Sequence, residues 1–182
     1  MVNENGFIAA IVANKDEDEQ AEPFFFREDA LIKIPGFTVA VKCFRNSEIV
    51  QDETGEVVVV IYGQLYDGVS ATRLASRYKN SGIACFESLN GSFVILVIDK
   101  SQEKIILVTD RLSSLKLFRI QKGNTIFITS VLKYLVSKDA ALDPVGIAWY
   151  FSNGYVQNNR TIFNGISCLE RASTSTSWVR SC

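Results

Sequence analysis

Residues 89–118 constrain the fold more than any other part of this sequence, because they contain two long apolar runs separated by a short polar turn. The runs cover residues 92–98 and 105–109 and are rich in Val and Ile, which favour β-strands. Neither run alternates between apolar and polar residues, so each is predicted to be a strand covered on both faces. The sequence therefore predicts a hairpin inside a layered structure, with a second sheet or helices on each side.

Shorter predicted elements surround this hairpin. Further strands are predicted at residues 6–13, 37–44, 56–63, 115–121 and 125–129. Helices are predicted at 70–79 with Ser70 as N-cap, at 83–89, at 131–137 with Ser130 as N-cap, and at 143–152 with Asp143 before Pro144. This order predicts an α+β fold in which two sheets stack and helices lie outside. We expect one domain at 1–172, followed by a tail at 173–182 that is either a last strand or the start of a linker.

Composition excludes several classes of function. The 182 residues suit one domain with a substantial core, and the net charge of −1 without a basic block argues against nucleic acid or an anionic membrane as partner. No apolar run reaches the roughly 20 residues that span a bilayer, and the N-terminus lacks a secretory signal pattern. The four cysteines show no CxxC spacing, so no metal or redox site is predicted. Cys43 and Cys85 are expected to be buried free thiols in a reducing, cytoplasmic protein.

The chain has no histidine. This absence excludes Ser-His-Asp and Cys-His catalysis and removes the commonest metal ligand. Any chemistry on this chain must therefore use another general base, such as a chain-terminal amine.

Six short motifs in chain order resemble those of one known family. Where that family has Asn-Gly-Glu-Ile-Tyr-Asn, residues 62–67 read YGQLYD, and its Leu-x-Gly-x-Phe resembles LNGSF at 89–93. Asp99 resembles the family's aspartate at the end of the strand that begins in this motif. Residues 110–118 are similar to the family's Asp-Arg-x-Gly-x-x-Pro-Leu-Tyr. Residues 127–133 are similar to its Phe-x-Ser-Glu-x-Lys, and residues 160–169 are similar to its Arg-Thr-x-Phe-x-Gly-Ile-x-x-Leu. The series resembles the N-terminal glutaminase domain of asparagine synthetase over residues 5–172.

This resemblance implies a class II glutamine amidotransferase with the four-layer αββα sandwich of the N-terminal-nucleophile (Ntn) hydrolases. In that family an N-terminal cysteine attacks the glutamine amide, its α-amine acts as base, and an Asn-Gly pair forms the oxyanion hole. Here Asn5 takes the nucleophile's place and Tyr62 replaces the asparagine, while Gly63 remains. The family also has an aspartate that binds the substrate amine, and residues 68–72 contain no acidic residue to match it. Arg45 is the candidate to hold a substrate carboxylate, with a surface arginine as the alternative.

The resemblance also assigns a structural role to Asp110 and Arg111, which we expect to form a charged pair that holds a turn. Ser113 and Lys116 replace the family's turn glycine and proline, so the turn is expected to be altered.

The resemblance favours a degenerate glutaminase-like domain without a catalytic residue, similar to the cysteine-less domains of β-lactam synthetase and lasso-peptide cyclases. Such a domain would act as a scaffold or interface, docking through residues 24–26 (FFF) and the tail. The alternatives are an active glutamine-hydrolysing enzyme of asparagine biosynthesis and a regulatory module that binds a small amino acid. No cofactor is expected on this chain, since ATP and Mg²⁺ would belong to a separate synthetase domain that acts as a ligase. The expected partners are that domain or subunit and a second copy.

Overall fold

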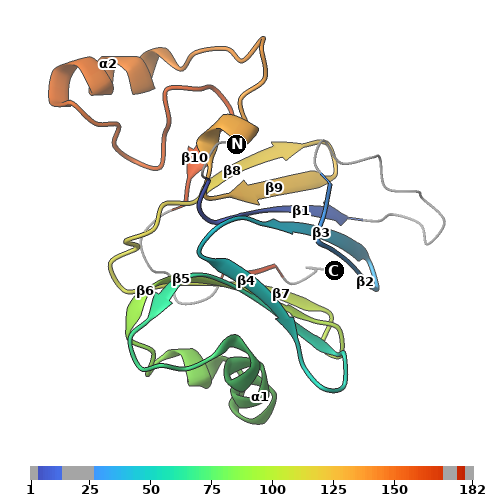
Figure 1. The fold of residues 1–182 in the computed structure, drawn as a ribbon. Coiled ribbons are helices and arrows are strands. Elements are labelled where there is room, and N and C mark those ends of the chain that lie inside the picture. The colour runs from blue at the N-terminus through green and yellow to red at the C-terminus, as the bar shows by residue number, and fades with distance from the viewer. Residues whose placement is uncertain (1–3, 14–26, 170–175, 179–182) are drawn as a thin grey trace.

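The computed structural model describes residues 4–13, 27–169 and 176–178, and in these residues two antiparallel sheets stack against each other (Figure 1). The six-stranded sheet has the order β10-β8-β9-β1-β3-β2 and the five-stranded sheet the order β11-β7-β6-β5-β4. The strands are β1 Phe7–Ala13, β2 Ala30–Ile34, β3 Phe37–Cys43, β4 Ser47–Gln51, β5 Val57–Leu65, β6 Gly91–Asp99, β7 Lys104–Thr109, β8 Phe118–Lys122, β9 Thr125–Thr129, β10 Ser167–Cys168 and β11 Thr176–Trp178. The helical elements are α1 Ala71–Ser81, η1 Gly82–Phe86, η2 Leu132–Tyr134 and α2 Pro144–Asn153.

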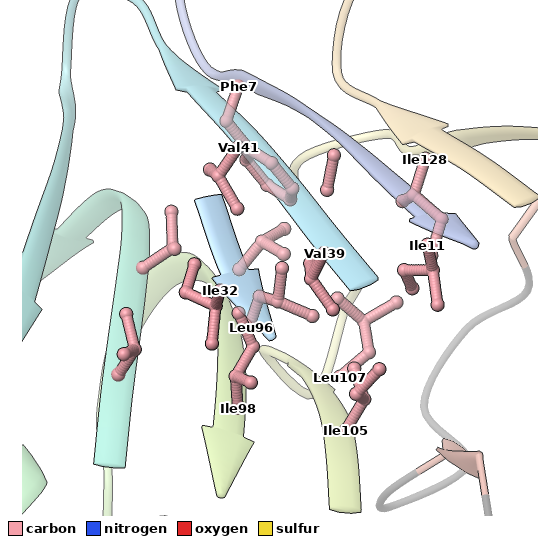
Figure 2. Close-up of a cluster of buried hydrophobic side chains, with 14 of the residues drawn as sticks. Phe7, Ile11, Ile32, Val39, Val41, Leu96, Ile98, Ile105, Leu107 and Ile128 are labelled. Carbon is pink, nitrogen blue, oxygen red and sulfur yellow. The ribbon is translucent and has the colours of Figure 1, made fainter. Parts of the chain in front are cut away.

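The predicted central hairpin is confirmed as β6 and β7, which pair from Val94–Thr109 to Asp99–Lys104. Its side chains face two cores because both sides are covered. Val94, Leu96 and Ile98 point into the core between the sheets, while Ile95 and Val97 pack toward α1. Figure 2 shows the inter-sheet core, where side chains of β1 and β3 meet those of β6 and β7. Burial on both faces explains why the run does not alternate.

The outer faces of the two sheets are covered differently. Helix α1 and η1 cover the five-stranded sheet through a second buried cluster that includes Leu74 and Phe86. The six-stranded sheet is covered by Leu135 beside η2 and by residues 163–166, which pack on Ala10 and Ala40 of the sheet. The α+β class and the stacked sheets are thus confirmed, while the fourth helical layer stays a prediction.

Helix boundaries follow the predicted capping residues. Ser70 accepts a hydrogen bond from the Arg73 N–H at 3.3 Å, and Gly82 ends α1 in a conformation with φ +58°. Asp143 accepts from the Val145 N–H at 3.1 Å with Pro144 in the first turn, and Gly154 ends α2 in the left-handed region. These signals are local, so sequence alone locates them.

Four parts of the prediction differ from the structure. Strands β2 and β4 were not expected, because both are five-residue strands at or near sheet edges with mixed polarity. The strand expected at 115–121 begins only at Phe118, since residues 110–117 cross from one sheet to the other. The predicted helix at 131–137 shrinks to η2, and Ser130 does not cap it, because its hydroxyl accepts from the Phe7 N–H at 3.1 Å. The helix expected at 83–89 is the shorter η1.

Some predicted features fall partly or wholly outside the described residues. Residues 24–26 and Cys182 lie there, as does most of the tail, of which 176–178 form β11 against β7. Cys85 is buried and Cys43 is half-buried, each as a free thiol. In the described part of the chain no helix is long and apolar enough to cross a bilayer.

Burial raises the pKa of two groups in the helical layer, one in α1 and one in η1. Tyr78 donates to the buried Asp99 carboxylate at 2.9 Å, and desolvation followed by this hydrogen bond raises the pKa of its phenol. Desolvation raises the pKa of the Cys85 thiol to about 11, above its ordinary value near 9. The folded protein therefore keeps protons that the unfolded chain loses in alkali.

We expect the free energy of unfolding to fall as the pH rises above about 9, by roughly 1–2 kcal/mol between pH 9 and 11 from the thiol alone. Urea unfolding at closely spaced pH values measures this slope. Cys85→Ala should lower stability at every pH yet flatten the slope between pH 9 and 11. An unchanged slope in that variant would contradict the assignment to Cys85.

Candidate active-site cleft

The start of β1 is held by backbone hydrogen bonds to the end of β3. The Gly6 N–H donates to the Arg45 carbonyl at 2.8 Å, and the Arg45 N–H donates to the Glu4 carbonyl at 3.1 Å. The Phe44 N–H donates to the Gly6 carbonyl at 2.7 Å. Asn5 and Arg45 thus form an isolated parallel bridge, which sets residue 5 beside the end of β3.

Glu4 adds a side-chain anchor that the sequence did not reveal. Its carboxylate forms an ion pair with Lys133 and accepts a hydrogen bond from the Tyr134 hydroxyl. The hydrogen bond from Lys133, then that from Tyr134, holds the pKa of Glu4 below its usual value. The partners lie about 130 residues apart in sequence, so only the folded chain brings them together.

A cleft of about 670 Å³ opens at this end of the sheets. Most of its lining residues carry carboxamide or hydroxyl groups, and Leu115 of the crossover segment closes one wall. The lining residues are Asn5, Asn46, Ser47, Glu48, Ile61, Tyr62, Gly63, Gln64, Ser92 and Leu115. Three of the predicted site residues, Asn5, Tyr62 and Gly63, therefore share one cleft.

Asn5 is tied to a neighbour that sequence analysis did not select. The Asn46 side-chain amide donates to the Asn5 side-chain oxygen at 3.2 Å. Asn46 itself has φ +56°, a left-handed conformation that asparagine tolerates better than most residues. A carboxamide is not a nucleophile, and here its oxygen already accepts a hydrogen bond. The residue at the start of β1 therefore offers no group for attack on an amide.

The Gly63 N–H also has an internal partner. It donates to the Asn46 carbonyl at 2.9 Å, so it does not point freely into the cleft as an oxyanion donor must. Asn46 thus contacts both Asn5 and Gly63, the two residues that the resemblance places at the nucleophile and oxyanion positions. The turn after β3 was predicted only as polar, and nothing local in the sequence shows these contacts.

Tyr62 lies half-buried where the resembling family has an asparagine. Burial raises the pKa of its phenol, so the ring stays neutral at physiological pH. The Tyr62 ring also lies close to Gly6, since a Cβ added at Gly6 would come within 3.3 Å of it. The aromatic ring therefore occupies part of the space between β1 and β5.

Arg45 is close to the cleft in sequence but does not line it. Its side chain is exposed, and its backbone rather than its guanidinium contacts residues 4–6. The role of Arg45 in holding a carboxylate stays a prediction. In the described part of the chain, no group of three or more acidic, Cys or His side chains is placed to hold a metal ion.

Asp110 holds the crossover turn through backbone groups. Its buried carboxylate accepts from the N–H groups of Phe93 at 3.3 Å, Leu112 at 2.9 Å and Ser114 at 3.1 Å. Arg111 is exposed, and the ion pairs of the described residues do not include Asp110 with Arg111. The charge-assisted bonds of Asp110 therefore run to the main chain instead of the neighbouring guanidinium.

Gly63 is required by the backbone as well as by its position in the cleft. Its φ is +103°, and an added Cβ would lie 2.2 Å from the Ser92 carbonyl oxygen. Gly63→Ala should therefore lower the free energy of unfolding by about 2–4 kcal/mol through backbone strain and overpacking. Urea denaturation measures this loss. Gly68→Ala is the matched control, since an added Cβ there meets nothing within 4 Å although φ is also positive; equal losses in both variants would contradict the steric argument.

Comparison with protein families identifies a related domain family. A family model described as a glutamine amidotransferase domain matches residues 66–181, which is more than half of the chain. The matched range begins just after Tyr62 and Gly63 and includes the Asp110 turn and helix α2. A search of curated proteins returned no match.

Proposed function

The chain belongs to the glutamine amidotransferase domain family, and from that premise we propose that it is a degenerate member that does not hydrolyse glutamine. The observation that carries this proposal is the hydrogen bond between Asn5 and Asn46 at the position of the nucleophile. The backbone carbonyl of the same residue, Asn46, accepts a hydrogen bond from the Gly63 N–H. A nucleophile and a free oxyanion donor are both needed for amide hydrolysis. Residue 5 supplies no nucleophile, and the Gly63 N–H is not a free donor, because it is bonded to the Asn46 carbonyl.

We further propose that the domain has the Ntn-type αββα architecture and derives from an asparagine-synthetase-like ancestor. The stacked antiparallel sheets and the absence of histidine agree with this proposal. Its role would be that of a scaffold or interaction domain for an ATP-dependent, amide-forming synthetase domain or subunit in the cytoplasm. ATP and Mg²⁺ would bind to that partner.

A glutaminase assay tests the central statement. The unmodified protein incubated with L-glutamine should release no ammonia above the blank, while an active glutamine amidotransferase measured in parallel sets the detection limit. Intact-mass measurement of the same sample determines whether residues 1–4 are present. Ammonia release by the unmodified protein would support the active-enzyme alternative and overturn the proposal.

The size of the cleft favours a second candidate, a module that binds a small amino acid. Its volume of about 670 Å³ lies within the range of ligand pockets, and carboxamides and hydroxyls dominate its lining. Arg45 with Gly63 would anchor the ligand, which requires the Arg45 side chain to turn inward. Thermal unfolding with and without L-glutamine or L-asparagine tests this candidate. A ligand-dependent rise that disappears in Arg45→Ala but not in Arg111→Ala would support it, and no rise would exclude these two ligands.

A further inference from the structure

Helix α2 is an uncharged helix that the described domain leaves uncovered. None of its ten residues is acidic or basic, and Gly146 is its one buried residue. A helix that is apolar all round is normally buried on all sides. Figure 1 shows α2 projecting beyond the six-stranded sheet instead of lying on it.

Specific contacts hold the N-terminal part of α2 in place. A Cβ added at Gly146 would lie 2.2 Å from the Thr161 carbonyl oxygen, so only glycine allows this close approach. Arg160 forms an ion pair with the N-cap residue Asp143 at 2.7 Å, and the Asp143 N–H donates to the Ile162 carbonyl at 2.9 Å. The helix is therefore held in its projecting position by specific contacts.

Large apolar side chains are exposed on and around α2. They are Leu112 at 72%, Leu142 at 55%, Val145 at 47%, Tyr150 at 53%, Phe151 at 83% and Tyr155 at 58% exposed. Together they present on the order of 500 Å² of exposed side-chain surface, at the upper end of what monomers show. One side of a standard interface buries about 800 Å², more than half of it apolar, so this area suffices for a specific contact.

A hollow lies next to the projecting ring of Phe151. Its volume is about 720 Å³, and its apolar walls include Leu112, Phe118, Tyr150 and Tyr155. The Phe151 ring stands edge-on to Tyr150 with 6.0 Å between ring centroids. The exposed Phe151 ring thus contacts Tyr150, and Tyr150 is part of the wall of a hollow that has both apolar and polar lining residues.

We propose that this face binds a second copy of the chain, with Phe151 of each copy inserted into the hollow of the other. A two-fold contact uses the same patch on both subunits, so it requires that patch to be self-complementary. The exposed Phe151 side chain and the hollow together meet that requirement. Residues 144–159 carry no charge, so the inserted helix brings no charge into the hollow of the other copy. The charged residues that line the hollow are Arg160, which is paired with Asp143, and Lys116, which is exposed.

Sedimentation velocity of the unmodified protein tests the proposal from low micromolar to several hundred micromolar concentration. We expect a monomer–dimer equilibrium, and Phe151→Lys should weaken it at least tenfold while leaving the circular dichroism spectrum unchanged. Leu31→Lys is the matched control, since Leu31 is 49% exposed on β2 at the edge of the six-stranded sheet. This control should dimerise like the unmodified protein.

A charge-pair exchange tests the reciprocal insertion. Leu112→Glu alone should also weaken the dimer, and mixing it with Phe151→Lys should restore a heterodimer in which the introduced lysine of one copy meets the introduced glutamate of the other. A protein that stays monomeric over the whole range, an unaffected dimer in Phe151→Lys, or a mixture without recovery would each overturn the proposal. Binding of α2 to a different protein while the chain itself stays monomeric would also count against it.

Discussion

Placing a cysteine at position 5 is expected to leave glutamine hydrolysis undetectable, even in a chain whose first residue is that cysteine with a free α-amine. The new thiol and amine would supply the nucleophile and the base. The oxyanion hole would still be missing, because Tyr62 replaces one donor and the Gly63 N–H is bonded to the Asn46 carbonyl at 2.9 Å. Loss of one such donor costs about 10²–10³ in rate, so loss of two should cost on the order of 10⁴ or more.

Ammonia release from L-glutamine measures this result for the shortened Asn5→Cys chain. Reaction of the introduced thiol with a maleimide, located by peptide mass spectrometry, serves as the control that this thiol is present and accessible. The Asn46 carbonyl should remain bonded to the Gly63 N–H in this variant, since that backbone contact does not involve the Asn5 side chain. Ammonia release within a hundredfold of an active amidotransferase would contradict the assignment of a closed oxyanion site.

Asp110→Ala should be the most damaging single substitution outside the apolar core, lowering the free energy of unfolding by about 3–5 kcal/mol. The change leaves the N–H groups of Phe93, Leu112 and Ser114 without their common acceptor in a buried turn. Bonds to a charged acceptor contribute about 1.5–3 kcal/mol each and are not fully additive. The turn also joins the two sheets, so its loss affects both.

Arg111→Ala is the matched control, and it should change stability by no more than about 0.5 kcal/mol because the side chain is exposed. Asp110→Asn should give an intermediate loss, since an amide oxygen can still accept one or two of the bonds. Urea unfolding followed by tryptophan fluorescence measures all three variants. Similar losses of stability in Asp110→Ala and Arg111→Ala would support the charged pair that the resemblance predicted. They would contradict the role of Asp110 as an acceptor for backbone N–H groups.

Local sequence patterns identify some residues of the cleft and miss others. The sequence identified Asn5, Tyr62 and Gly63, and these three residues line one cleft. It did not identify Asn46 or Glu4, since an isolated asparagine or glutamate in a polar stretch carries no distinctive signal. Their importance comes from partners in other elements: Asn46 contacts residues 5 and 63, and Glu4 contacts residues 133 and 134.

Local sequence patterns were enough to locate the buried strands and the capped ends of α1 and α2, because apolar runs and capping side chains are properties of neighbouring positions. The assignment of residue 5 as the nucleophile position came from the resemblance to a family and not from such a pattern. Long-range contacts determined the rest. The edge strands β2 and β4 form because β3 and β5 offer them unpaired backbone groups. The Gly63 N–H is occupied because folding brings the Asn46 carbonyl within 2.9 Å of it, which no pattern near either residue encodes.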